Sequence, residues 1–162
     1  MLKLSPVFSD GAVLCRGKEI RVFGEAEDGT LVRCELRGGQ DALLARGEGE
    51  ARDGHFLVLL PPQEAATGCR LVVSGGGETA ASLDICVGEV FLAGGQSNME
   101  LELQNADEGQ TLLRGHVNPL VRYFNVPKFG YACPERDEAW KAARWNAIGP
   151  GRGKDMSVSW RN

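Results

Sequence analysis

The sequence lacks an excess of basic residues and any long apolar run. Its 18 lysines and arginines stand against 22 aspartates and glutamates, a formal net charge of −4. A nucleic-acid-binding surface needs a basic excess on one face. No run approaches the roughly 18 apolar residues of a membrane span. Residues 1–6 also lack the charged segment and apolar stretch that open a signal peptide. We therefore expect no nucleic-acid partner, no membrane partner and a cytoplasmic location.

The five cysteines lack the spacing of a metal site or a disulfide framework. They stand at positions 15, 34, 69, 86 and 133, without a Cys-x-x-Cys pair. Zinc sites use closely spaced ligand pairs, and disulfide-stabilised domains carry an even and denser set. We expect buried free thiols.

The first half of the chain has the pattern of an all-β domain. Apolar and polar residues alternate in short segments, and glycine-rich turns separate these segments. Strands at this spacing predict an antiparallel β-sandwich over residues 1–87, with a hairpin turn at 52–55. The expected strands are residues 20–24, 31–37, 42–46, 56–60, 69–74 and 80–86.

The pattern changes after residue 87. Residues 90–93 are continuously apolar, as in a strand buried on both faces. Residues 109–114 predict a short helix, and residues 121–126 predict a second strand that Pro127 ends. The order strand, helix, strand predicts the opening of an α/β sheet over residues 88–162.

Ser97 follows the apolar run after two glycines, Gly94 and Gly95. A serine at a helix start beyond a strand exposes its hydroxyl, and nearby N–H groups can stabilise an oxyanion. The glycines allow a sharp turn and close approach of a substrate, and Gln96 and Asn98 complete the turn. The spacing alone also fits a serine that caps a helix. It does not fit the Gly-x-Ser-x-Gly elbow, because Met99 stands at the second glycine position.

The motif GQSNME at 95–100, preceded by VGEVFL at 87–92, resembles the nucleophile block of sialate O-acetylesterases. These are SGNH (GDSL-like) serine esterases that remove acetyl groups from carbohydrates. The segment FSDGAVLCRG at 8–17 is similar to the opening of that family, and residues 22–26 and 53–56 fit its N-terminal β-domain. The resemblance implies Ser97 as nucleophile and backbone oxyanion donor, a flavodoxin-like α/β/α domain, an O-acetylated saccharide substrate and no metal or cofactor.

The resemblance covers only the front portion of a typical family member. The Asp-x-x-His block that supplies the family's base has no match among these residues. His55 falls in the predicted hairpin turn and His116 in a loop, neither at the family's position for the base. We therefore expect a truncated portion of the enzyme with little activity of its own. Two strands without their neighbours expose apolar surface, which predicts self-association through the α/β part.

Other interpretations remain open at this point. The β-sandwich could be a non-catalytic module that contacts carbohydrate or protein, and the chain could come from a truncated reading frame. Trp140 and Trp145 could form a platform for sugars, although packing in a core or over a sheet edge is favoured. Residues 149–154 do not form a phosphate-binding loop, because Ile148 and Asp155 break the Walker pattern.

Overall fold

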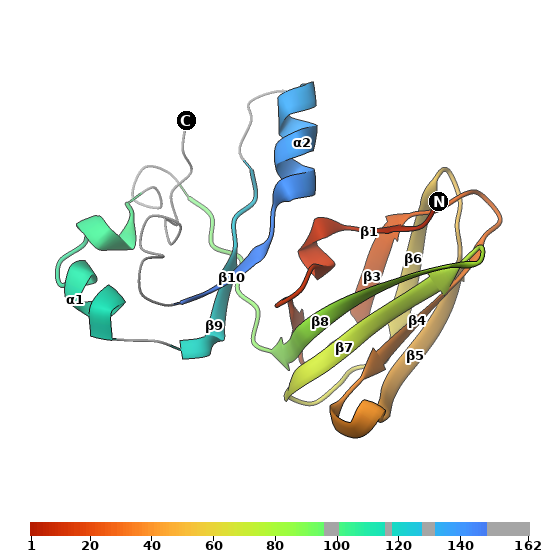
Figure 1. Cartoon of the computed structure of the whole chain (residues 1–162), viewed down its shortest axis with the longest axis horizontal. Coiled ribbons are helices and arrows are strands. Elements are labelled where there is room, and N and C mark those ends of the chain that lie inside the picture. Colours follow the sequence, from red (N-terminus) through yellow and green to blue (C-terminus); the bar gives the residue numbers. More distant parts are fainter. Residues whose placement is uncertain (96–100, 116–117, 128–131, 149–162) are drawn as a thin grey trace. The chain divides into compact units, whose positions relative to one another are not determined.

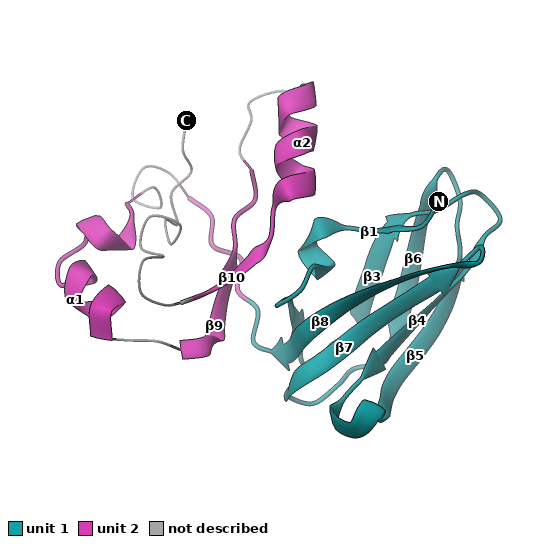
Figure 2. Ribbon diagram, viewed as in Figure 1, with its two compact units in different colours: residues 1–90 teal, residues 91–162 magenta. Residues whose placement is uncertain are grey.

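The computed structural model describes residues 1–95, 101–115, 118–127 and 132–148. It divides into two compact units, Met1–Val90 and Phe91–Asn162 (Figure 2). The N-terminal unit holds strands β1 (Lys3–Leu4), β2 (Val13–Cys15), β3 (Ile20–Glu25), β4 (Leu31–Arg37), β5 (Leu43–Glu50), β6 (His55–Leu60), β7 (Ala66–Gly75) and β8 (Glu78–Gly88), with short 3-10 turns η1 (Pro6–Phe8) and η2 (Gly39–Asp41). The C-terminal unit holds η4 (Leu103–Asn105), α1 (Gly109–Gly115), β9 (Asn118–Phe124), α2 (Pro134–Ala142) and β10 (Trp145–Ile148).

The strands of the N-terminal unit form two sheets (Figure 1). One sheet has the order β1-β3-β6, and the other has the order β2-β8-β7-β4-β5. Each of the predicted strands overlaps an observed one, from β3 to β8, so the expected β-rich domain is confirmed. The expectation of purely antiparallel pairing is wrong at one place, because β2 pairs with β8 in parallel. With only three residues, β2 is too short to show a period-2 pattern in the sequence.

One core lies between the inner faces of these two sheets. Alternate residues are buried along β4 and β6, as a sheet with one solvated face requires. All but one of the buried apolar side chains of the described residues belong to this unit, and the exception is Leu113. The largest fully buried side chains are Leu36, Leu60, Leu71, Ile85, Val22, Val32, Val58, Val73, Cys34 and Cys69.

The two sheets meet closely where β5 lies against β6. A Cβ atom on Gly47 would overlap the carbonyl oxygen of Leu59, and one on Gly49 would overlap that of Leu57. Strands β5 and β6 belong to different sheets, so these contacts close one edge of the core. Glycine is required at both positions because the neighbouring atoms are backbone and cannot rotate away.

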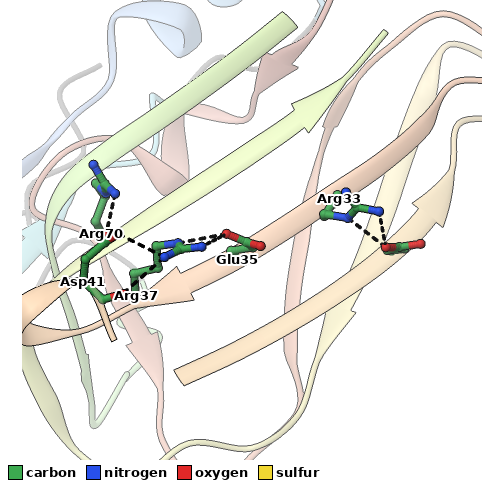
Figure 3. Close-up of polar contacts among 6 residues, drawn as sticks. Arg33, Glu35, Arg37, Asp41 and Arg70 are labelled. Atoms are coloured by element: carbon green, nitrogen blue, oxygen red, sulfur yellow. Dashed lines mark hydrogen bonds and ion pairs between the residues drawn. The ribbon is translucent and has the colours of Figure 1, made fainter. Parts of the chain in front are cut away.

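Ion pairs cover the outer face of the larger sheet (Figure 3). Arg37 and Arg70 stand directly opposite each other on β4 and β7, an arrangement that repels. Asp41 bridges the two at 3.0 and 2.6 Å. To reach them the turn holds Gln40 and Asp41 at φ values of 54° and 61°, which cost energy for residues other than glycine. Two further ion pairs lie on this face, Arg37–Glu35 at 2.6 Å and Arg33–Glu48 at 2.8 Å. These four ion pairs are called the charge ladder below.

The C-terminal unit contains the predicted helix as α1 and the predicted strand as β9. The partner of β9 is β10, which pairs with it in antiparallel orientation. The predicted buried strand at 90–93 is wrong in this structure, because these residues form no strand and Phe91 and Leu92 are 86% and 97% exposed. An apolar run indicates burial in a sheet but does not supply the neighbouring strand.

The tryptophans of this unit pack against one residue of β9. The ring centroids of Trp140 and Trp145 lie 5.8 and 5.6 Å from that of Phe124. These distances are typical of packed aromatic pairs. The geometry agrees with the packing interpretation of both tryptophans and joins α2 and β10 to β9.

The cysteines are free thiols. Cys34, Cys69 and Cys86 are buried, whereas Cys15 and Cys133 are half-buried. Burial raises the pKa of Cys34 from 9.0 to about 12, and the charge of Glu35 adds to the effect. Burial also raises the pKa of Cys69. The described part of the chain contains no helix long and apolar enough to cross a membrane.

The contact between β5 and β6 predicts that Gly47→Ala destabilises the N-terminal unit. Because the new methyl would overlap backbone, we expect a loss of at least about 2 kcal/mol in the free energy of unfolding. Gly39→Ala is the matched control, since a Cβ there meets no atom within 4 Å, and it should stay within about 0.5 kcal/mol. Urea denaturation followed by circular dichroism measures both. Equal effects of the two substitutions would contradict the close-packing argument.

The raised pKa of Cys34 predicts a stability that falls in alkali. Between pH 9 and about 12 the unfolded thiol ionises while the folded one stays protonated. The folded state therefore binds more protons, and stability falls by up to about 1.4 kcal/mol per pH unit. Urea midpoints measured across this range should fall less steeply in Cys34→Ala. Val32→Ala, which truncates a fully buried side chain of the same strand without a titratable group, should retain the full decline.

Candidate functional site

The predicted nucleophile segment lies partly outside the described residues. Gln96, Ser97 and Asn98 are not described, and neither is His116. The roles assigned to them from the sequence stay predictions. Gly94 and Gly95 are the last described residues before Ser97, and both are exposed. A Cβ on Gly94 would meet no atom within 4 Å, so open space surrounds the chain at this point.

The chain enters this segment from the end of β8, which β2 holds in place. The last pair of the parallel ladder joins Cys15 to Gly88. One residue further, the backbone N–H of Arg16 donates to the carbonyl of Gly88 at 2.9 Å. The Nε–H of Arg16 also donates to Oε1 of Glu89 at 2.6 Å. The backbone contacts fix the chain as far as Gly88, nine positions before the predicted nucleophile, and the exposed Arg16–Glu89 pair adds a weak contact one residue further.

The described residues that follow the predicted nucleophile segment form a locally ordered turn and helix. The 3-10 turn η4 leads into α1 through a tight approach of Gly109, where a Cβ would overlap the carbonyl oxygen of Leu103. The side-chain amide of Gln110 donates to the carbonyl of Gln104 at 3.2 Å. Leu113 on α1 is 6% exposed. Residues 102–115 are therefore held by backbone hydrogen bonds, by the side-chain hydrogen bond of Gln110 and by the buried side chain of Leu113.

His55 is the only histidine among the described residues, and it belongs to a turn. Asp53 and Gly54 have φ values of 53° and 78°, the left-handed pair that a tight hairpin turn between Arg52 and His55 needs. Arg52 and His55 exchange backbone hydrogen bonds of 2.8 and 3.0 Å. The side chain of His55 is exposed at the start of β6. The structure thus gives His55 a place in a hairpin of the N-terminal unit, as the sequence predicts.

The described part of the chain contains no cluster of side chains that could bind a metal ion. Groups of three or more histidine, cysteine, aspartate and glutamate side chains that could hold an ion do not occur there. The buried thiols of Cys34 and Cys69 are also poor nucleophiles near neutral pH, because their raised pKa values keep them protonated. Ser97 remains the residue for which the sequence predicts nucleophilic chemistry.

No protein-family model matches the chain, and no curated protein matches it. Among solved structures, the chain is similar to a carbohydrate acetylesterase from Xanthomonas citri. The TM-score is 0.78 and the sequence identity is 27% over 96% of this chain. The match spans 34% of the solved chain, so this chain corresponds to about a third of that protein's length.

The approach of Gly109 to Leu103 predicts that Gly109→Ala loosens the segment after Ser97. Alanine favours helix by up to about 1 kcal/mol over glycine, but the overlap with backbone should outweigh this gain. We expect roughly tenfold faster amide exchange across residues 103–113, measured by mass spectrometry. Gly115→Ala is the control, because its Cβ meets nothing within 4 Å. Slower exchange in Gly109→Ala would show that propensity dominates.

Proposed function

We propose that this chain carries the nucleophile-bearing portion of a carbohydrate O-acetylesterase. The observation that supports the proposal most is the similarity to the Xanthomonas citri acetylesterase over 96% of the chain, at a TM-score of 0.78. The GQSNME motif at 95–100 supports it independently, since its resemblance to an esterase nucleophile block rests on local sequence.

The proposed chemistry is acyl transfer through Ser97. Its Oγ attacks the carbonyl carbon of an acetyl ester while a base takes the hydroxyl proton. The sugar oxygen leaves with a proton, and an acetyl-enzyme remains. Water then attacks the acetyl group, acetate leaves, and the proton returns to Ser97. The backbone N–H of Ser97 is the proposed oxyanion donor, and this chemistry uses no cofactor.

The sequence does not identify the general base of this mechanism. In esterases of the resembled family a histidine oriented by an aspartate takes the proton. The sequence holds His55 and His116, neither of them within an Asp-x-x-His block. His55 also lies in a hairpin turn of the N-terminal unit. We therefore propose that the intact site obtains its base from polypeptide beyond these residues, in this or another chain.

The finer parts of the proposal concern fold and substrate. Residues 88–162 are proposed as the start of an SGNH-type α/β/α domain. The order of α1 and β9 supports this proposal, whereas the antiparallel pairing of β9 with β10 does not, because the sheet of such a domain is mainly parallel. The substrate class is an O-acetylated saccharide, and sialic acid is the candidate that the family resemblance favours. The similarity to the acetylesterase supports a saccharide ester as the substrate class. Sialic acid as the sugar is supported only by the sequence motif.

The chain alone should release acetate from 4-nitrophenyl acetate no faster than its Ser97→Ala variant, because a serine without a base loses most of its rate. The same holds for an O-acetylated sialic acid. Turnover that disappears in Ser97→Ala would instead locate a base within this chain or a second copy, with His116 as the first candidate.

A chimera tests the proposal directly. This chain replaces the matching third of the Xanthomonas citri acetylesterase and is joined to the rest of that protein. We expect acetate release that Ser97→Ala lowers by about a thousandfold or more. Ser5→Ala is the control, because Ser5 makes no side-chain capping bond, and it should retain full activity. A folded chimera without Ser97-dependent activity would refute the esterase proposal.

A non-catalytic module is the second candidate, and the distribution of the core favours it. The N-terminal unit holds nearly all buried apolar side chains of the described residues. Saccharide binding by this chain that persists in Ser97→Ala, together with an inactive chimera, would support that role.

A further inference from the structure

The outer faces of the two sheets of the N-terminal unit carry different groups. The larger sheet presents the charge ladder to solvent, with Leu31 exposed on the same face at the start of β4 (Figure 3). The smaller sheet presents an apolar patch that consists of Phe23, Leu57 and Leu59, which are 43%, 51% and 45% exposed. Exposed apolar side chains that lie together on one face are candidates for an interaction site, whereas a single exposed leucine is not.

Strand register places the three side chains of the patch together. Phe23 on β3 stands directly opposite Leu57 on β6, and Arg21 stands opposite Leu59. Burial alternates along both strands, so these residues share the outer face. The ring of Phe8 packs edge-on against Phe23 with centroids 5.0 Å apart. This contact holds the Phe23 ring in place before any partner binds.

The charges around the patch have opposite signs at its two ends. On β3, Arg21 and Glu25 each stand two positions from Phe23, on either side. Their ion pairs within the chain are long and exposed, with Arg21–Glu19 at 3.4 Å and Lys3–Glu25 at 3.5 Å. Pairs of this kind contribute little stability, so both groups can exchange partners at small cost.

We propose that this face binds the same face of a second copy of the chain. A two-fold axis through Phe23, in the plane of the interface and perpendicular to β3, reverses the strand direction of the second copy. Arg21 then meets Glu25 of the second copy, and the reciprocal pair forms by symmetry. Phe23 and Leu57 each meet their own copy at the centre, Leu59 lies opposite His55 of the second copy, and the Arg21–Glu25 pairs form at the rim, where charged groups lie in protein interfaces generally.

The patch suits a protein partner better than a saccharide. Its centre consists of one phenylalanine and two leucines, none of which offers a hydrogen-bonding side chain to sugar hydroxyls. The face is also small, so the association is weak and depends on concentration. Sedimentation velocity over about a hundredfold range of protein concentration is therefore the appropriate measurement.

Leu57→Glu places a charge in the centre of the proposed interface, and we expect the dimer dissociation constant to rise at least about tenfold. Leu31→Glu is the matched control. Leu31 is 57% exposed on β4, on the face of the charge ladder, and its substitution should leave the dimer unchanged. A chain that stays monomeric at every concentration overturns the proposal. So does a dimer that Leu57→Glu leaves intact, since association then uses another surface.

Charge reversal tests the two-fold arrangement itself. Arg21→Glu alone should weaken the dimer, because symmetry turns two attractions into two repulsions, and Glu25→Arg alone should do the same. The double variant restores both pairs with exchanged signs and should recover most of the affinity. If the double variant associates no better than either single one, Arg21 does not face Glu25 across the interface, and the arrangement is wrong. Circular dichroism of each variant confirms that the fold is retained.

Discussion

The N-terminal unit depends on a backbone-to-backbone contact between β5 and β6, two strands that belong to different sheets. At Gly47 and Gly49, β5 lies against the carbonyl groups of β6. The glycines allow the strands to approach more closely than any side chain would permit. This contact closes the core along one side, and the alternating burial of β4, β6 and β7 then follows from having two inner faces to fill. The outer faces are free to differ, one carrying ion pairs and the other an apolar patch.

The sequence predicts the β-rich unit well because period-2 alternation is a local property. Strands β4 and β6 alternate without interruption, and both were predicted nearly to the residue. Strand β2 is not predicted, because three residues are too few to show an alternating pattern. Its parallel pairing with β8 depends on tertiary contacts, which the local sequence does not show. The run at 90–93 shows the opposite failure. Its apolar residues match a buried strand, yet Phe91 and Leu92 are exposed because no described strand lies beside them.

In the candidate site too, features set by neighbouring residues are predictable from the sequence, and features set by tertiary contacts are not. The motif around Ser97 is recognisable from consecutive residues, and so is the hairpin turn that holds His55. The identity of a base is not local, because nucleophile and base come together only through the fold. Likewise, the sequence predicted β9 but not its pairing with β10. Only Leu113 is a buried apolar side chain in the described part of the C-terminal unit, so few tertiary contacts there were available to predict.

The parallel pairing of β2 with β8 has a mechanical consequence. Tension applied between the chain just before Val13 and the chain beyond Glu89 pulls these two strands in opposite directions along their own axes. Every hydrogen bond of the ladder from Val13–Cys86 to Cys15–Gly88 is then loaded at once in shear, instead of opening one after another as in a hairpin that is peeled apart. The Arg16–Glu89 pair extends the loaded region past the last ladder residue. The N-terminal unit therefore resists tension along β8 through a shear-loaded ladder.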